Sequence, residues 1–233
     1  QGFNAVPSLS YAIIDPPPLG ASAAKGDACE ASHGTHVAGI IAAIGNNGRG
    51  VVGVAPDAKI QPLRALGRCG GTIEDIITAI LWGSGVSVIG LPQNPHPASV
   101  LNLSLGGRGS CSVAMQTAIN AAVAKGVPVV VAAGNDNEAL ANEMPANCSN
   151  VIRVVASTYE GARAPYSNYG SSAAPATIAA PGGSGSDGAD VNDWILSTWN
   201  FGSQSVGTPA YAGMVGTSMA APHVAGVAAL LKQ

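Results

Sequence analysis

Charged side chains are scarce in this sequence. Only 10% of its 233 residues are Asp, Glu, Lys or Arg, whereas soluble domains usually contain about a quarter. The formal net charge of −3 means that no basic patch points to nucleic acid as a partner. The hydrophobic share of 47%, with 31 glycines and 16 prolines, indicates a compact, loop-rich globular protein and excludes a disordered chain.

Long apolar runs are also missing. None approaches the roughly 20 residues that a membrane-spanning helix needs, so we expect no membrane association. The first residues, "QGFNAVPSLS", show no basic segment followed by an apolar core, so no signal peptide is expected here. A mature protein that had already lost its leader would look the same.

No two cysteines are spaced as C-x-x-C, which argues against a structural zinc site. The four cysteines are Cys29, Cys69, Cys111 and Cys148. An even number is compatible with two disulfides in an oxidising compartment. Their places among the predicted elements favour the pairs Cys29–Cys69 and Cys111–Cys148, and four free thiols are the alternative.

What the sequence does contain is an alternation of strand and helix patterns. Continuous apolar runs predict buried parallel strands, and apolar residues at helical spacing predict helices. The expected strands are Tyr11–Asp15, Ser99–Gly107, Lys125–Asn135, Asn150–Thr158 and Ala176–Gly182. The expected helices begin near His33, Ile73, Val113 and Ser218. This order predicts one domain over residues 1–233, with a doubly wound α/β fold: a mostly parallel sheet with helices on both faces.

Apolar residues at helical spacing form a stripe along several of the expected helices. Between residues 72 and 85 the stripe comprises Ile73, Ile76, Ile77, Ile80 and Leu81. In the next helix we expect it to contain Val113, Ile119 and Val123, with Gly126 ending the helix.

Three polar residues stand where such a fold binds ligands, beyond the carboxyl ends of its strands. His33 begins a helix, although a lone histidine is more often structural and His36 is also available. Ser218 precedes a helix and is surrounded by residues with small side chains, in "VGTSMAAPHVAG". Pro222 is expected in the first turn of that helix. The alternative is that Ser218 only caps the helix. Asn135 follows an apolar strand and could donate to an oxyanion, or form a turn.

Serine catalysis needs a nucleophile, a general base, an oxyanion donor and a carboxylate that orients the base. Ser218, His33 and Asn135 supply the first three. Asp15 is the only acidic residue directly after a predicted strand upstream of His33, in "YAIIDPPPLG". These residues predict a catalytic site with the chain order Asp, His, Ser.

The motifs "HGTHVAG", "LNLSLGG", "AAGN" and "GTSMAAPHVAG" resemble the hallmark segments of the subtilisin-like serine proteases, of the secreted bacterial type with disulfides. The chain order Asp, His, Ser is also that of this family. The resemblance implies that Ser218 is the nucleophile, His33 the base and Asn135 the oxyanion donor. It further implies a substrate pocket with two walls. One wall would be Ser104, Leu105 and Gly106, and the facing wall Ala132, Ala133 and Gly134.

The sequence departs from the family at both ends. Three prolines follow Asp15 where family members carry Ser or Thr and then Gly, and the connection from Asp15 to His33 is short. Asp27 and Glu30 are alternative carboxylates. The chain also stops soon after the Ser218 helix, so we expect the N-terminal part to be shortened and the C-terminal end truncated relative to the family.

The resemblance also implies a structural calcium ion. The segment "GNNGRGVVGVAP" is similar to a family loop that binds calcium through backbone carbonyls and an Asn side chain, here Asn47. An ordinary Asn-Gly turn is the alternative.

We therefore expect a secreted, extracellular, monomeric serine endopeptidase that acts on polypeptide substrates and is inhibited by a propeptide before maturation. The competing interpretation is a catalytically impaired relative that binds peptides because its triad Asp region is deleted. An α/β-hydrolase esterase would need a G-x-S-x-G elbow and the order Ser, Asp, His, and "GTSMA" provides neither.

Overall fold

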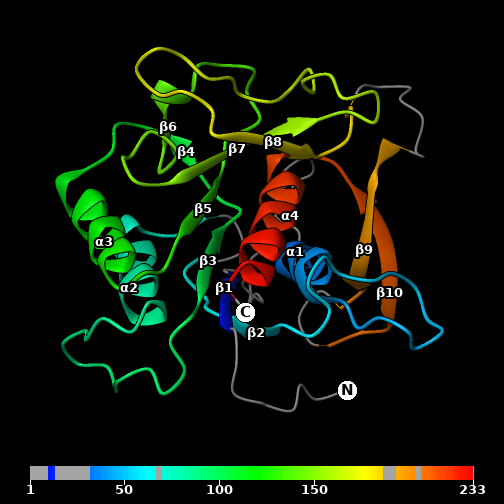
Figure 1. Cartoon of the computed structure of the whole chain (residues 1–233), viewed down its shortest axis with the longest axis horizontal. Helices are drawn as coiled ribbons and strands as arrows, with labels where there is room; N and C mark the ends of the chain where they lie inside the picture. Colours follow the sequence, from blue (N-terminus) through cyan, green and yellow to red (C-terminus); the bar gives the residue numbers. More distant parts are fainter. Residues whose placement is uncertain (1–9, 14–31, 67–69, 186–192, 203–205, 233) are drawn as a thin grey trace.

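The computed structural model of this chain describes residues 10–13, 32–66, 70–185, 193–202 and 206–232. Its centre is a six-stranded parallel sheet with the strand order β2-β1-β3-β5-β7-β8 (Figure 1). The strands are β1 (Ser10–Ile13), β2 (Lys59–Pro62), β3 (Val100–Leu103), β5 (Val129–Ala132), β7 (Ile152–Ser157) and β8 (Ile178–Pro181). The predicted parallel α/β sheet is thereby confirmed.

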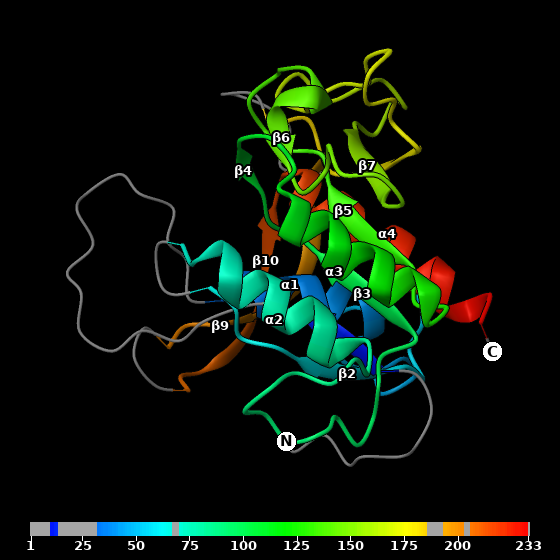
Figure 2. The same ribbon diagram turned by 90° about the vertical axis from the view of Figure 1, so that its left-hand side faces the viewer.

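Helices cover both faces of this sheet, as predicted. Two lie on one face, α2 (Ile73–Gly83) and α3 (Val113–Ala124), and two on the other, α1 (His33–Ala42) and α4 (Thr217–Leu230) (Figures 1 and 2). Neighbouring strand residues alternate between the two cores: Val129 and Val131 face α2 and α3, whereas Val130 faces α1 and α4. A strand covered on both sides reads as an unbroken apolar run, because both sets of alternating side chains are buried.

The strand expected at Tyr11–Asp15 is present as β1. It lies inside the sheet, between β2 and β3, and pairs with both in parallel. Its observed bounds are Ser10–Ile13, and Asp15 lies outside the described residues.

The expected apolar stripe of α3 is confirmed for Ile119 and wrong for Val113 and Val123. Val113 is 85% exposed and Val123 is also exposed, whereas Met115, Ala118, Ile119 and Ala122 face the core. The buried side of α3 thus combines two large residues, Met115 and Ile119, with alanines that pack closely against the sheet, and the two valines lie on the other side. The stripe of α2 holds for Ile76 and Ile80, while Ile73 is exposed.

Two small antiparallel ribbons flank the main sheet. The strands β9 (Ile195–Asn200) and β10 (Pro209–Met214) lie beside α1. The strands β4 (Gly107–Arg108) and β6 (Glu143–Met144) pair near the ends of β3 and β5, and a short 3₁₀ helix, η1 (Leu140–Asn142), precedes β6. Among the described residues, no helix has the length and apolar character needed to span a bilayer.

Candidate active site

The site is assembled at the carboxyl edge of the sheet. Segments Ser104–Gly106 and Ala133–Asn135 directly follow the neighbouring parallel strands β3 and β5. Helix α4 begins beside them and presents Ser218 in its first turn. The topology therefore brings together three segments that are far apart in the sequence.

Ser218 is held against Ser104 by two hydrogen bonds. The Ser104 hydroxyl donates to the Ser218 carbonyl (2.8 Å), and the Ser218 hydroxyl donates to the Ser104 carbonyl (3.3 Å). Pro222 explains why the Ser218 carbonyl is available, because a proline lacks the N–H that would bond to the carbonyl four residues earlier. Pro222 therefore lies in the second turn of α4, and the prediction of a first-turn proline is wrong.

Asn135 is oriented by Thr217. Its side-chain oxygen accepts hydrogen bonds from the backbone N–H and the hydroxyl of Thr217, both at 2.9 Å. The Asn135 Nδ2 group has no acceptor within the described part of the chain, and neither has the backbone N–H of Ser218. Both are therefore donors available to a bound ligand at the N-terminus of α4, where the helix dipole favours negative charge.

Gly216 precedes this helix turn with φ 151°. Residues with side chains rarely adopt that conformation. A Cβ atom at this position would also lie 3.8 Å from the Asn135 side-chain amide. The glycine therefore permits the sharp entry into α4 and keeps the space before Asn135 open.

His33 stands at the first residue of α1, which packs against α4. Hydroxyl groups of β9 fix the first turn of α1: Ser197 donates to the His36 carbonyl (2.7 Å) and Thr198 to the Thr35 carbonyl (2.8 Å). Gly39 lies so close to these hydroxyls that a Cβ atom would collide with both.

The two histidines of the motif have different environments. His36 is fully buried, donates through Nε2 to the Ala212 carbonyl (3.0 Å) and meets the Trp199 ring edge-on. His33 is partly exposed. Burial, with a smaller contribution from nearby His36, lowers the pKa of His33 to about 4. His33 is therefore neutral at pH 7, as a general base must be.

The described residues show no hydrogen bond between His33 and Ser218, because the Ser218 hydroxyl is directed to Ser104. The carboxylate predicted to orient His33, Asp15, lies outside the described residues, and so do the alternatives Asp27 and Glu30. The arrangement thus brings Ser218 and Asn135 to one site, with Ser104 hydrogen-bonded to Ser218, and places His33 on an adjacent helix.

A cavity of about 440 Å³ opens beside Ser218. Its lining comes from the ends of β3 and β5, from β4 and β6, and from the start of α4. The lining residues are Leu105, Gly106, Gly107, Arg108, Ala132, Gly134, Asn135, Asp136, Glu143, Thr217 and Ser218.

Most of the two predicted pocket walls line this cavity. Leu105 and Gly106 come from one wall, and Ala132 and Gly134 from the other. Ser104 and Ala133 do not line it. Ser104 instead bonds to Ser218, and Ala133 is fully buried behind the wall.

Sequence reasoning missed Glu143 among the lining residues. It lies in the segment "ALANEMPANC", which carries no strand or helix signal and has the polar composition of a surface loop. Only the pairing of β4 with β6 turns Glu143 toward the cavity, with Arg108 opposite it in register. Asp136 was also missed, although its position directly after Asn135 was a usable signal.

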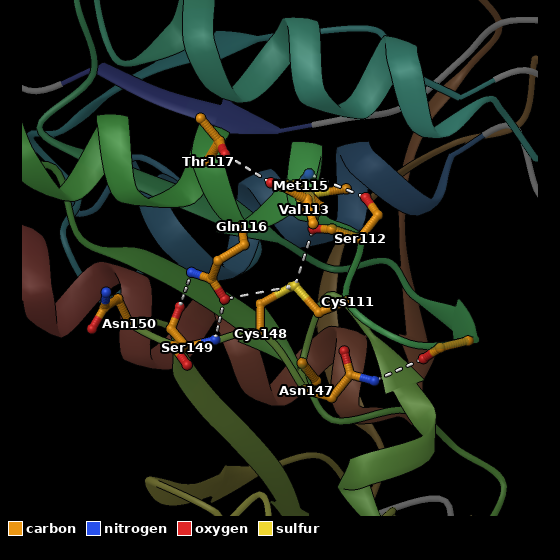
Figure 3. Close-up of a disulfide and its surroundings, with 12 residues drawn as sticks. Cys111, Ser112, Val113, Met115, Gln116, Thr117, Asn147, Cys148, Ser149 and Asn150 are labelled. Atoms are coloured by element: carbon orange, nitrogen blue, oxygen red, sulfur yellow. Dashed lines mark hydrogen bonds between the residues drawn. A yellow bond between two sulfur atoms is a disulfide. The ribbon is translucent and has the colours of Figure 1, made fainter.

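The predicted disulfide Cys111–Cys148 is confirmed, with a Cα–Cα distance of 5.1 Å (Figure 3). It joins the chain just before α3 to the chain just after β6. Beside it, the Gln116 side chain donates to the Ser149 carbonyl (3.1 Å) and accepts from the Ser149 N–H (2.7 Å). These links hold together the two loops that carry β4 and β6. The predicted partner pair, Cys29–Cys69, lies outside the described residues.

Asn47, the predicted calcium ligand, lies in an exposed turn. Its side-chain oxygen accepts from the Arg49 N–H (2.9 Å), which is the geometry of an ordinary Asn turn. Within the described residues, no three His, Cys, Asp or Glu side chains are grouped to hold a metal ion. A calcium ion at Asn47 would thus depend on backbone carbonyls.

The site combines a serine at a helix start with an asparagine amide near it, at the edge of a parallel α/β sheet. These are features of a serine hydrolase, which is the class that the sequence motifs indicated. Comparison with known proteins agrees. The profile of the subtilase family matches residues 21–233, so this chain belongs to that family.

Individual relatives support the assignment. The chain is 53% identical over 200 residues to an extracellular protease of Xanthomonas campestris, covering 86% of this chain, and 47% identical to an extracellular basic protease of Dichelobacter nodosus, covering 85%. It spans about a third of the length of these two relatives (32% and 31%). A solved protease structure from Pseudoalteromonas arctica matches with a TM-score of 0.80 and 55% identity, covering 86% of this chain and 58% of that one.

Proposed function

We propose that this chain is a single peptidase domain, residues 1–233, that hydrolyses peptide bonds as a secreted serine endopeptidase. The observation that carries the proposal is a pair of donors, Asn135 Nδ2 and the Ser218 N–H, that have no acceptor among the described residues and lie at the cavity lined by Ser218. Donors fixed in advance at such a place stabilise the oxyanion that forms when a hydroxyl attacks a carbonyl.

In the proposed reaction, His33 takes the Ser218 proton as the hydroxyl oxygen bonds to the peptide carbonyl carbon. Asn135 and the Ser218 N–H hold the resulting oxyanion. The C–N bond then breaks, the amine leaves with the proton from His33, and an acyl-enzyme remains. Water, deprotonated by His33, attacks the ester, and the carboxylic acid leaves as Ser218 regains a proton. Asp15 is the proposed partner that keeps His33 in the correct tautomer.

Thr217 and Ser104 support these steps without touching the reacting atoms. Thr217 holds the Asn135 oxygen, so that the amide nitrogen is the group that faces the ligand. Ser104 fixes the Ser218 backbone. Before reaction, the Ser218 hydroxyl has to turn from the Ser104 carbonyl toward His33.

A fluorophosphonate probe tests the proposal, because it labels a serine only if that serine is activated. We expect labelling of Ser218 and hydrolysis of casein, and we expect Ser218→Ala to abolish both while the circular dichroism spectrum is retained. Ser172→Ala is the matched control, since Ser172 is exposed and lies in a loop away from the cavity. Hydrolysis that survives in Ser218→Ala would exclude this mechanism.

One observation favours the competing function, a peptide-binding domain without catalysis: the Ser218 hydroxyl is bonded to Ser104 and not to His33. That function predicts that peptides bind equally well to the unaltered protein and to Ser218→Ala, and that the fluorophosphonate labels neither.

The remaining features of the proposal are expectations from the resemblance to the subtilases, and the names of two relatives support one of them, secretion. Polypeptides are the substrates, a propeptide inhibits the site before maturation, and the domain works as a monomer. Because two relatives are named extracellular proteases, we propose that this chain is also secreted. Calcium bound at Asn47 would contribute to stability only, since that turn does not line the cavity.

A further inference from the structure

Glu143 has an unusual position for a carboxylate. The residue is only 5% exposed, yet its side chain lines the cavity that reaches Ser218. In the described part of the chain, no side chain or backbone donor forms a hydrogen bond or ion pair with its carboxylate oxygens. A buried carboxylate without a partner is costly, so its place at a cavity points to a ligand that supplies the missing partner.

The carboxylate lies between two glycines from opposite walls. A Cβ atom on Gly106 would collide with Glu143 Oε1, and one on Gly134 would lie 3.0 Å from its carboxyl carbon. A side chain on Gly106 would displace Glu143, and one on Gly134 would collide first with the Asn168 amide nitrogen. The Glu143 side chain therefore fills the space beside both glycines, and the cavity extends from it to Ser218 and Asn135.

The charges around the cavity do not compensate Glu143. Asp136 also lines the cavity and has the same sign. Arg108 is opposite Glu143 across the β4–β6 ribbon, but its guanidinium group is paired with Glu138. Burial, and secondarily Asp136, raise the pKa of Glu143 to about 7, with a smaller opposing effect from Arg108 and a further increase from Glu138.

This arrangement specifies the substrate, and the inference rests on the proposed peptidase function. The carbonyl attacked by Ser218 belongs to the residue on the N-terminal side of the cleaved bond, so the side chain of that residue is the one that can enter the cavity. We propose that Glu143 makes this protein select Lys or Arg at that position. The alkyl stem occupies the cavity that opens beside Ser218, and the cationic end meets the Glu143 carboxylate where it lines that cavity.

The first experiment compares peptide amides that differ only in that residue: Lys, Arg, or norleucine, which is lysine without the ammonium group. We expect kcat/KM to be higher for Lys and Arg than for norleucine. Hydrogen bonds to buried charged groups are consistent with a ratio of roughly 10 to 100. Glu143→Gln preserves the shape and should bring that ratio close to one, mainly by lowering the values for Lys and Arg.

Glu160→Gln is the matched control. It removes the same charge from an exposed turn that does not line the cavity, and it should leave the ratio unchanged. A wild-type preference for norleucine, or a ratio that is the same in Glu143→Gln, would overturn the inference.

The pH dependence of the same substrate preference is a second test of the role of Glu143. Ionisation of Glu143 should make the Lys-to-norleucine ratio of kcat/KM rise between pH 6 and 8, and Glu143→Gln should have a flat profile. Because the ratio compares two substrates of one enzyme, titration of His33 cancels. A wild-type ratio that is constant over this range would contradict the role of Glu143.

Binding separates this inference from the proposed function. If the wild type cleaves none of the peptides, the peptidase proposal fails, while fluorescence titration of Ser218→Ala with the Lys and norleucine peptides still decides the inference. Tighter binding of the Lys peptide, lost in Ser218→Ala combined with Glu143→Gln, supports it. Equal binding of the two peptides to Ser218→Ala overturns it.

Discussion

The side-chain oxygen of Asn135 accepts two hydrogen bonds from Thr217, one from the backbone N–H and one from the hydroxyl, both at 2.9 Å. The amide can therefore present only its nitrogen to a ligand beside Ser218. The Thr217 hydroxyl in turn accepts from the Gly134 N–H (3.1 Å), so the end of β5 and the start of α4 are joined at this point.

Loss of the amide donor should reduce turnover and leave binding nearly intact. We expect Asn135→Leu to lower kcat about 100- to 1,000-fold, the loss known for removing the oxyanion asparagine of subtilisin, a member of this family. KM should change little, since the donor acts mainly in the transition state. Thr217→Val, which loses only the orienting hydroxyl, should lower kcat by a smaller factor. Steady-state kinetics on one peptide amide check both, and an unchanged kcat in Asn135→Leu would contradict the assignment.

The carboxylate partner of His33 remains a prediction from the sequence. Asp15→Asn should lower kcat about 10,000-fold, because the triad carboxylate holds the tautomer that accepts the proton. Asp27→Asn is the control variant, and we expect its kcat to be nearly that of the unaltered protein. If instead Asp27→Asn gives the large loss, Asp27 is the third member of the triad.

The Cys111–Cys148 disulfide closes a loop with a sequence separation of 37. A loop of this length should contribute about 2–4 kcal/mol to the free energy of unfolding, mainly by restricting the unfolded chain. Replacing both cysteines by alanine should therefore lower the denaturation midpoint in guanidinium chloride. The Ser218→Ala background prevents autolysis during the measurement. An unaltered midpoint would show that the bridge has no stabilising role.

Glu143 makes the free energy of unfolding depend on pH. Its folded pKa, about 7, is above the ordinary value of 4.5, so the folded state holds the proton more tightly than the unfolded state does. Its contribution to stability is present below pH 4.5 and is lost as the pH rises to about 7. Glutamine does not titrate. In the Ser218→Ala background, Glu143→Gln should thus gain stability relative to the parent between pH 5 and 8.

The histidines act in the opposite direction. Burial is the main cause that lowers the pKa values of His33, His36 and His223, so at acid pH the unfolded state binds more protons than the folded state. Stability should then fall as the pH drops below about 6.5. Comparison of the two variants at each pH isolates the effect of Glu143 from this shared background. A difference that does not vary with pH would contradict the burial of Glu143.

Calcium should raise the melting temperature if the Asn47 turn binds it. Thermal unfolding of Ser218→Ala in calcium chloride and in EGTA should differ, since a ligand that binds only the folded state stabilises it. Asn47→Ala should remove the difference. Equal melting temperatures in both buffers would leave Asn47 as an ordinary turn residue.

Local pattern was sufficient for much of this fold. The run Val129–Val131 predicted a strand covered on both faces, and each of these valines is fully buried. The motif around Ser218 predicted a buried helix, and Thr217–Leu230 is one. The pairing of Cys111 with Cys148 also followed from their positions between predicted elements. The strand and the helix could be predicted because the spacing of apolar residues reflects burial. The disulfide could be predicted because the order of the elements along the chain is visible in the sequence.

Tertiary structure decided the rest. Nothing in the sequence around Glu143 indicates that it is buried, because its environment is created by Gly106, Gly134 and Arg108 from distant segments. The direction of the Asn135 amide depends likewise on Thr217, which is far away in the chain. The sequence alone determined the family, the parallel sheet and the candidate nucleophile. Only folding places Glu143 in the cavity and orients the Asn135 amide, because contacts between distant segments leave no local pattern in the sequence.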